Sequence, residues 1–329
     1  MKLAIVTTSY PSHPGDPAGH FVETEARCLV REGHEVFVLS PVSSPWREGD
    51  PHHVRVSGAP LFGWPGAIER FRANPWKASY ALAFVSSVRR ALRRLAPLDQ
   101  IRAHWIVPSA WPAALGRVPL SIVAHGSDVR LLQRMPRVAA RAILADLIQR
   151  GATFQCVSHA LREDLVELYP KLGERTSVAP CSLDVQGVPN REQARQVLGV
   201  TAQRLIAIVG RLIRTKRTHL AISAASLVPD AHVVVIGDGP ELPALRSAFP
   251  TITFLGRLPR ELTLTWISAA NVLISASRDE GAPTVVREAL ALGTEVVAAP
   301  SGDLSAWAKT QPLLWVTRGA PSCATGHGA

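Results

Sequence analysis

Two glutamates, Glu280 and Glu288, stand with seven residues between them in the stretch "DEGAPTVVREALALG". Glu280 lies in a predicted turn after an apolar strand, and Glu288 lies about one turn inside a short apolar helix that should begin near Thr284. Pro283 suits the first turn of this helix, because its fixed φ and missing N–H cost nothing there. The amides of Thr284 and the next residue then remain available to donate hydrogen bonds to a ligand.

The neighbours of Glu288 in the predicted helix are apolar, and a carboxylate in such surroundings is expected to be paired or bound to a ligand. A carboxylate at this place is well suited to hydrogen-bond a vicinal diol such as ribose. The alternative is a glutamate on the helix surface, paired with Arg278 or Arg287.

A pair of cations follows another predicted strand, in the stretch "IVGRLIRTKRTH". Arg211 and Lys216 flank a loop that leaves the strand and enters a helix. Ligands of open parallel sheets bind beyond the carboxyl ends of the strands, and two cations beside a helix N-terminus suit a diphosphate. The alternative is a solvated basic loop.

Two weaker signals lie in the first half of the chain. His125, in "VAHGSD", follows a predicted strand, and the glycine after it permits a sharp turn or a close approach to a ligand. Gly19 stands just before a predicted helix, where backbone amides can contact a phosphate. A histidine in such a place is more often structural, and the glycine loop lacks the GxGxxG pattern.

The composition restricts the classes of protein to which the chain can belong. Its 329 residues and 47% apolar content suit two packed cores, and the net charge of +10 favours anionic partners. The spacing of Cys28, Cys156, Cys181 and Cys323 fits neither a zinc site nor a disulfide framework, so a reducing compartment is expected. We find no signal peptide and no apolar run of the roughly 18 residues that a membrane span needs. The protein is therefore expected to be cytoplasmic, in solution or at the membrane surface.

Strand and helix patterns alternate along most of the chain, which predicts an α/β fold with parallel sheets. The alternation breaks near residues 180–200 and then restarts. We predict two Rossmann-like domains, 1–190 and 191–329, facing a cleft, with a poorly ordered tail over 318–329. The predicted strands lie within 2–10, 35–41, 101–108, 119–128, 152–156, 204–210, 232–237, 251–256, 271–276, 295–299 and 313–316. The main predicted helices begin near residues 21, 79, 158, 218, 240, 259 and 284.

Taken together, these features resemble retaining glycosyltransferases of the GT-B fold, specifically glycosyltransferase family 4. The resemblance runs from residue 3 to about residue 300. It rests on the Gly19 loop and on the motifs "AHGSD", "VGRL…K", "IGDGP", "FLGRL" and "EGAPTVVRE". Their order along the chain is specific as a set, although no single motif is.

The resemblance implies a role for each matching position. His125 and Glu280 would contact the transferred sugar and are the predicted catalytic residues. Within the donor site, Arg211 and Lys216 would hold the diphosphate, and Glu288 would bind the ribose. The complete predicted donor-binding set is Gly19, Arg211, Lys216, Arg257, Pro283, Thr284 and Glu288.

The residue types suit transfer from a nucleotide sugar without a metal. Cations aimed at the departing diphosphate stabilise the charge that develops on it. GT-A enzymes use a D-x-D motif and a metal for this task, and no D-x-D occurs in this sequence. We therefore expect no cofactor and no metal site. The resemblance also implies retention of the anomeric configuration, by front-side displacement with the leaving phosphate as base.

The sequence departs from the family pattern near its end. Family members usually continue past the last strand with a helix that crosses back to the first domain, and this chain ends at "TRGAPSCATGHGA". We therefore expect a second domain that is truncated at its C-terminus. Two alternatives stay open: a catalytically impaired remnant that acts as a binding partner, and a GT-B-like sugar-nucleotide epimerase.

A basic helix is the candidate surface for an acceptor or a membrane. Residues 68–95 contain seven basic residues and one acidic residue, with aromatic residues interleaved. Such a surface suits anionic lipid at the inner face of the cytoplasmic membrane, and the acceptor would be a lipid-linked sugar, a polysaccharide or a glycolipid. Nucleic-acid binding is not expected, because no recognition motif accompanies the charge. The alternative is an ordinary amphipathic helix packed on its sheet. The membrane-surface candidates are Arg89, Arg90, Arg93 and Arg94.

Overall fold

The computed structural model describes residues 1–13, 15–42, 50–62, 67–114, 116, 118–278 and 280–317. The chain divides into two compact units, Met1–Asp184 and Val185–Ala329. The boundary expected between residues 190 and 191 falls inside the second unit, because Val185 and Val188 pack on that unit's core. The predicted disordered tail, 318–329, lies outside the described residues.

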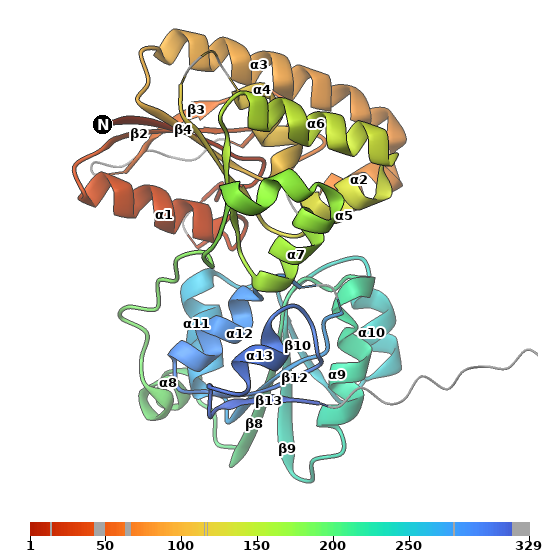
Figure 1. Cartoon of the computed structure of the whole chain (residues 1–329). Coiled ribbons are helices and arrows are strands. Elements are labelled where there is room, and N and C mark those ends of the chain that lie inside the picture. Colours follow the sequence, from red (N-terminus) through yellow and green to blue (C-terminus); the bar gives the residue numbers. More distant parts are fainter. Residues whose placement is uncertain are drawn as a thin grey trace, which may run out of the picture. The chain divides into compact units, whose positions relative to one another are not determined.

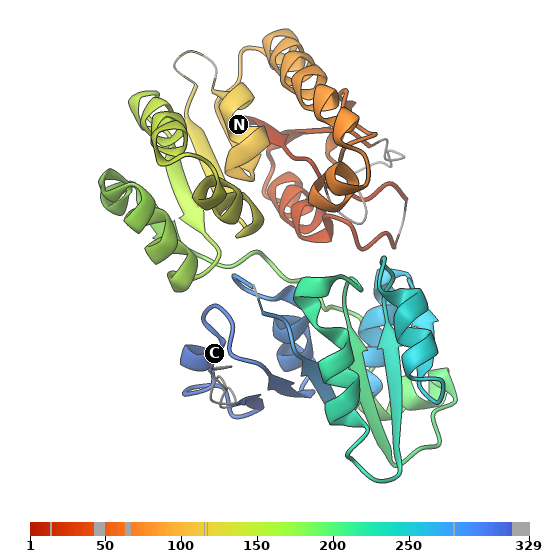
Figure 2. The ribbon, with the colours of Figure 1, turned by 90° about the vertical axis from the view of Figure 1, so that its right-hand side faces the viewer.

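The first unit is built on a parallel sheet of seven strands, in the order β3-β2-β1-β4-β5-β6-β7. The central strands are buried apolar runs, as expected for a parallel sheet covered on both faces. Helices α1 and α3 lie on opposite faces of the sheet (Figure 1, Figure 2). The strands are β1 Lys2–Val6, β2 Glu35–Ser40, β3 His52–Arg55, β4 Gln100–His104, β5 Leu120–Ala124, β6 Thr153–Cys156 and β7 Thr176–Val178.

The helices of this unit follow amphipathic patterns. Val22 and Ala26 of α1 are fully buried against Leu3 and Ile5 of β1. Just beyond the end of α1 stands Gly33 at a φ of 85°, a conformation that glycine adopts without strain. The helices are α1 His20–Arg31, α2 Ala67–Ala73, η1 Pro75–Ala78, α3 Ser79–Leu95, η2 Ile106–Ala110, α4 Trp111–Ala113, α5 Ser127–Arg134, α6 Arg137–Gln149, α7 His159–Leu168 and η3 Pro170–Arg175.

The second unit contains a parallel sheet of six strands, in the order β10-β9-β8-β11-β12-β13. Successive residues of β8 point to opposite faces, with Ile206 and Ile208 toward α9 and α10 and Leu205 and Ala207 toward α8 and α11. Figure 1 shows these two pairs of helices on the two sides of the sheet. The two Rossmann-like sheets confirm the predicted α/β class.

The predicted strands of this unit are confirmed, including the short one near residue 314. Helix α8 begins at a capping box, in which the Asn190 side chain accepts from the Gln193 amide. The elements are α8 Arg191–Leu198, β8 Arg204–Val209, η4 Arg214–Lys216, α9 Thr218–Ala225, β9 Ala231–Ile236, α10 Leu242–Ala248, β10 Thr253–Gly256, α11 Arg260–Ala269, β11 Val272–Ser275, α12 Thr284–Ala291, β12 Glu295–Ala298, α13 Leu304–Trp307 and β13 Leu314–Val316.

Two local interpretations of the sequence were wrong or incomplete. No strand was predicted between residues 41 and 67, yet this segment contains β3, which pairs with β2 at the edge of the sheet. Its residues are polar because an edge strand does not need the apolar pattern of a central one. Helices α5 and α6 were not predicted.

Candidate active site

The second sheet reverses its winding direction between β8 and β11, which are neighbours in the sheet but not in the chain. Ligands of such sheets bind beyond the carboxyl ends of the strands at this switch point. The two loops that leave the sheet here span 210–217 and 276–283. They carry Arg211, Lys216 and Glu280, so three of the predicted residues lie at one edge of one sheet.

Glu280 is held from three directions. Its Oε1 forms an ion pair with the Lys216 ammonium and accepts a hydrogen bond of 2.6 Å from the Ser277 hydroxyl. Its backbone N–H donates to the Ser301 hydroxyl at 2.8 Å, and that hydroxyl donates in turn to the carbonyl of Arg278. The Lys216 and Glu280 side chains are only 24% and 17% exposed. The pair is therefore fixed in place while keeping an accessible side.

Glu280 carries a negative charge at neutral pH. Burial raises the pKa of its carboxyl, but the Lys216 ammonium and the Ser277 hydroxyl, with the Arg211 guanidinium further off, outweigh burial and hold the pKa below its ordinary value. An ionised carboxylate accepts hydrogen bonds and cannot donate one. Glu280 is thus suited to bind hydroxyl groups and not to act as a general acid.

The loop after β12 holds the turn that contains Glu280. At Gly302, φ is 51°, and a Cβ atom would meet the carbonyl oxygens of Gly281 and Glu280 at 2.3 and 2.6 Å. Only glycine permits this close approach of the two loops. The segment "PSGDLSAW" thus supports Glu280 through Ser301 and Gly302.

Glu288 is one of the few charged residues that are buried in the described part of the chain, with 5% of its surface exposed. It lies in α12 beside the buried Val286 and Ala289, as predicted. Its ion-pair partner is Arg260 at the start of α11, where the sequence suggested Arg278 or Arg287 as the alternative. The Arg260 side chain is 14% exposed, so the pair is almost fully desolvated.

The remaining predicted donor residues lie near the same edge or on adjoining loops. Pro283 caps α12 with a φ of −64°, and Thr284 is the first helical residue, as predicted. Arg211 directly follows Gly210 in the loop after β8, whereas Arg257 is exposed on the loop after β10. Because β10 is separated from β8 by β9, the loop that carries Arg257 does not adjoin the switch point in the strand order.

The "IGDGP" motif interlocks with the loop that carries Arg211. The amide of Leu212 donates to the carbonyl of Asp238 at 2.9 Å. A Cβ atom at Gly237 would meet the carbonyl oxygen of Gly210 at 1.8 Å, and one at Gly239 would meet that of Leu212 at 2.4 Å. The two glycines therefore allow the loops after β8 and β9 to pack together and fix the backbone beside Arg211.

His125 belongs to a separate polar cluster within the first unit. It follows β5, and the buried Asp128 accepts hydrogen bonds from the amides of His125 and Gly126 at 3.1 and 2.9 Å. Its Nε2 lies 3.0 Å from Nδ1 of His104, and the Cys181 sulfur lies 3.7 Å from its Nδ1. Burial, with the nearby charges of His104 and Arg102, lowers the pKa of His125 well below its ordinary value. The ring is therefore neutral at neutral pH.

Gly19 is required locally by the fold. It precedes α1 with a φ of 70°, and a Cβ atom would lie 2.2 Å from the carbonyl oxygen of Ser9. The amides of Val22 and Glu23 both donate to its carbonyl. These backbone contacts explain why the fold needs glycine at this position, with no ligand involved. The predicted approach of Gly19 to a phosphate stays a prediction.

The sequence did not reveal several partners of the predicted residues. Arg260 lies four residues after the predicted strand 251–256. Because it is far from Glu288 along the chain, the sequence alone does not indicate that the two side chains form an ion pair. His104 is buried at 0% exposure and lies at the carboxyl end of β4, in the motif "IRAHWIVP". Because the predicted strand ran over 101–108, the sequence did not place His104 at a carboxyl end. No feature of the sequence indicated a role for Glu25, Ser277 or Ser301.

Comparisons with known proteins agree with this geometry. Residues 18–186 match the family model of Glycosyltransferase Family 4, and residues 203–321 match that of Glycosyl transferases group 1. The chain is also 30% identical to a teichuronic acid biosynthesis glycosyltransferase, TuaC, of Bacillus subtilis (strain 168), over 95% of this chain and 85% of the relative. The chain belongs to glycosyltransferase family 4. It is therefore a glycosyltransferase, as the resemblance implied.

Solved structures show that this family 4 glycosyltransferase has the GT-B fold. Sucrose-phosphate synthase from Thermosynechococcus elongatus matches it with a TM-score of 0.76 at 17% identity, covering 96% of this chain and 85% of that one. HepE of Anabaena in complex with UDP-glucose matches with a TM-score of 0.71 at 18% identity, with the same coverage. At such identities these likenesses concern the fold alone.

Proposed function

We propose that this family 4 glycosyltransferase transfers a sugar from a UDP-, GDP- or ADP-sugar to a lipid-linked, polysaccharide or glycolipid acceptor, with retention of configuration and without a metal. The observation that carries the proposal is the switch point of the second sheet, where Arg211 and the Lys216–Glu280 pair lie on the two loops. The UDP-glucose complex of the fold relative HepE supports a nucleotide-sugar donor.

The cations and the carboxylates would have different tasks. Arg211 and Lys216 would hold the diphosphate and stabilise the charge that develops on it as the glycosidic bond breaks. Helix amides at Thr284 would add donors to the same group. With two fixed cations and these amides, no metal is needed to neutralise the leaving group.

The carboxylates would recognise hydroxyl groups. Glu280, ionised and partly accessible, would accept hydrogen bonds from hydroxyls of the transferred sugar. Glu288, held by Arg260, would accept from the ribose of the nucleotide. His125 would contact the transferred sugar. The leaving phosphate would take the acceptor's proton in a front-side displacement.

Product analysis tests the reaction class. Purified protein is incubated with each nucleotide sugar and a bacterial lipid extract in the presence of EDTA, and the products are identified by mass spectrometry and NMR. We expect a glycosylated lipid or glycan with the donor's anomeric configuration, and unchanged turnover in EDTA. A free epimerised nucleotide sugar would favour the epimerase, and binding with no product at all would favour the catalytically impaired remnant.

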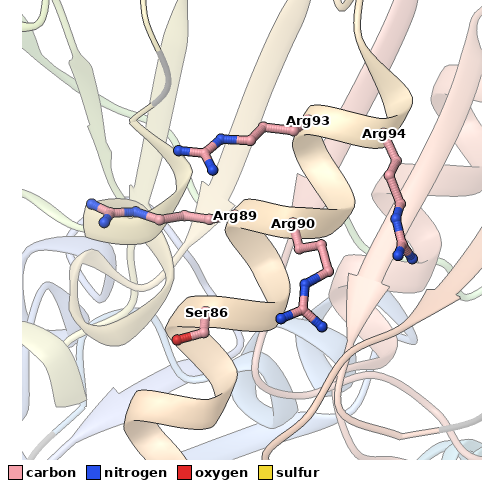
Figure 3. Close-up of a pocket in the computed structure, with 5 residues that line it drawn as sticks. All are labelled: Ser86, Arg89, Arg90, Arg93 and Arg94. Atoms are coloured by element: carbon pink, nitrogen blue, oxygen red, sulfur yellow. The ribbon is translucent and has the colours of Figure 1, made fainter.

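We further propose that helix α3 attaches the enzyme to an anionic membrane surface on the cytoplasmic side. Among the described residues, no helix has the length and apolar character to cross a bilayer. Four arginines project from α3 and, with Ser86, line a hollow of about 460 Å³ (Figure 3). Trp76 and Leu82, in η1 and the first turns of α3, are 88% and 73% exposed. The arginines are Arg89, Arg90, Arg93 and Arg94.

The arrangement of these side chains suits lipid headgroups. Arg89 and Arg93 point to one side of α3 and Arg94 to the other, with Arg90 between them (Figure 3). In the part of the chain that the structure describes, no carboxylate forms an ion pair with any of the four. Arg89 also stacks on Trp111, with 5.8 Å between its guanidinium carbon and the ring centre. Phe84, Val88 and Leu92 face inward and are fully buried. The helix thus packs on its sheet, with Arg90, Arg93 and Arg94 exposed and Arg89 half-buried.

Vesicle binding tests the membrane surface. Each arginine near an anionic bilayer contributes about 1 kcal/mol, so replacing all four by alanine should lower partitioning onto phosphatidylglycerol vesicles about a hundredfold or more. The control replaces four other exposed cations of the same unit by alanine, with the same change of charge, and should lower partitioning far less. The control residues are Arg134, Arg137, Lys171 and Arg175. The proposal would be contradicted if both variants lost the same partitioning onto phosphatidylglycerol vesicles. It would also be contradicted if the wild-type protein bound neutral vesicles as strongly as anionic ones.

A further inference from the structure

We propose that Arg217 is a positioning residue, whose side chain joins the two loops that carry Lys216 and Glu280 and so holds these two groups at the switch point. The loops span 210–217 and 276–283, and both belong to the second unit. The benefit for sugar transfer rests on the proposed function, whereas the connection between the loops does not depend on it.

Two hydrogen bonds connect the loops. The backbone N–H of Arg278 donates to the carbonyl of Thr215 at 3.0 Å. The Nε–H of Arg217 donates to the carbonyl of Ala276 at 2.7 Å. The two loops are therefore paired in opposite directions, 215 with 278 and 217 with 276. The side chain of Arg217 supplies the second of the two hydrogen bonds, and a backbone amide supplies the first.

The residues between these two hydrogen bonds are Lys216 and Ser277, and both contact Oε1 of Glu280. Lys216 forms the ion pair, and the Ser277 hydroxyl donates at 2.6 Å. A single hydrogen bond would let the loops pivot about it, whereas two bonds on either side of these contacts prevent the pivot. Arg217 therefore limits the movement of the Lys216 ammonium relative to the Glu280 carboxylate.

The backbone of Arg217 gains nothing from an arginine. Its φ of 48° and ψ of 43° lie in the left-handed region, which glycine adopts freely and which is unfavourable for residues with a side chain. Asp230, with a φ of 57°, has the short polar side chain that tolerates this region, and an arginine does not. The carbonyl of Arg217 begins α9 by accepting from the Leu220 amide at 2.9 Å, which any residue type permits. Glycine could not supply the hydrogen bond from Nε to Ala276.

The chemistry of the guanidinium suits a permanent connection. An arginine side chain stays charged throughout the neutral range, and hydrogen bonds from a charged donor are stronger than those between neutral groups. Arg217 is half-buried, so water competes less for this hydrogen bond than at an exposed site. The connection should therefore persist over the pH range in which the protein is folded.

Hydrogen exchange in the ligand-free protein, measured by NMR, tests the connection directly. In Arg217→Ala and in Arg217→Gly, the Arg278 amide should exchange about tenfold or more faster than in the wild type, because its hydrogen bond to Thr215 opens more often. The Ala299 amide donates to the carbonyl of Ser275 at 2.8 Å, just before the same loop. Its exchange should keep the wild-type rate in both variants.

The same two variants separate positioning from stability. Both remove the guanidinium, but Arg217→Gly also relieves the left-handed backbone, whereas Arg217→Ala retains that cost. The glycine variant should therefore unfold at a higher temperature than the alanine variant. Even so, kcat should fall about tenfold or more in both, because both leave the Lys216–Glu280 pair poorly positioned. If the arginine served stability alone, kcat would follow the unfolding temperature and recover in Arg217→Gly.

Arg204 provides the matched control. Its Nη1 donates to the carbonyl of Pro229 at 3.1 Å, so Arg204→Ala removes the same charge and a comparable hydrogen bond from the same unit. Arg204 is the first residue of β8, whereas the switch point lies beyond the last. In Arg204→Ala, the exchange of the Arg278 amide should be unchanged, and kcat should stay within about twofold of wild type.

The outcomes distinguish this inference from the proposed function. Wild-type exchange of the Arg278 amide in both Arg217 variants would overturn the inference, even if those variants had lost activity. Recovery of kcat in Arg217→Gly, or an equal loss in Arg204→Ala, would also overturn it. Faster exchange in both Arg217 variants of a protein that binds no nucleotide sugar would instead refute the proposed function and leave the connection between the loops standing.

Discussion

Replacement of Arg211 or Lys216 by alanine should lower kcat by about a hundred- to a thousandfold, the usual cost of removing one preorganised group that stabilises developing charge. Both cations lie at the switch point, and Lys216 is fixed there by its ion pair with Glu280. The loss should appear in kcat more than in KM, because the charge on the diphosphate grows as the bond breaks. Steady-state assays of each variant with the preferred nucleotide-sugar donor measure the changes in kcat and KM.

Arg214 provides the control for this prediction. It belongs to η4, the same short turn as Lys216, and its side chain is exposed. Arg214→Ala removes the same charge from the same loop and should leave kcat within about twofold of wild type, because an exposed charge contributes little. Equal losses in the Arg214 and Arg211 variants would mean that the loop acts through its overall charge and holds no specific diphosphate site.

Replacement of Glu288 by glutamine should weaken nucleotide binding about ten- to a hundredfold. Glu288 would accept hydrogen bonds from the ribose, and each hydrogen bond to a charged group contributes about 1.5–3 kcal/mol. Glutamine keeps the size of the side chain and one acceptor for Arg260. Calorimetric titration of the nucleoside diphosphate measures the change. Exposed Glu261, next to Arg260 on α11, provides the control as Glu261→Gln, whose affinity should stay at the wild-type value.

A double variant of the Arg260–Glu288 ion pair separates its effect on nucleotide binding from its effect on the stability of the protein. Removal of one partner from a buried ion pair costs about 3–5 kcal/mol, whereas replacement of both partners by apolar residues is often neutral. Arg260→Met combined with Glu288→Leu should therefore unfold near the wild-type temperature and still fail to bind the nucleotide. Recovery of binding together with stability would show that Glu288 serves the fold and does not contact the ligand.

Features that depend on local pattern could be predicted from the sequence. The strand that ends at Val209 and the helix that starts at Thr284 follow from apolar periodicity and from Pro283. Because the carboxyl ends of parallel strands meet at one edge of a sheet, Lys216 and Glu280 could be assigned to one site before their contact was known. Their direct ion pair is a detail of side-chain geometry that spacing does not contain.

Features that depend on pairing between distant segments could not be predicted. Arg260 and Glu288 approach each other because α11 and α12 pack together, and nothing in either helix's own sequence indicates the partner. Likewise, Glu25 is an ordinary polar position of an amphipathic helix until the fold brings it to Arg102 and His104. The edge strand β3 lacks the apolar signal of the central strands and was missed for that reason.

The proposed activity requires the second unit to bind a nucleotide sugar without a metal. The most direct test is calorimetric titration of UDP-, GDP- and ADP-sugars into the wild-type protein, each with and without EDTA. We predict that one nucleotide class binds at one molecule per chain, that EDTA leaves the affinity unchanged, and that Lys216→Ala weakens it. Absence of binding by every nucleotide sugar, or binding that EDTA abolishes, would contradict the account.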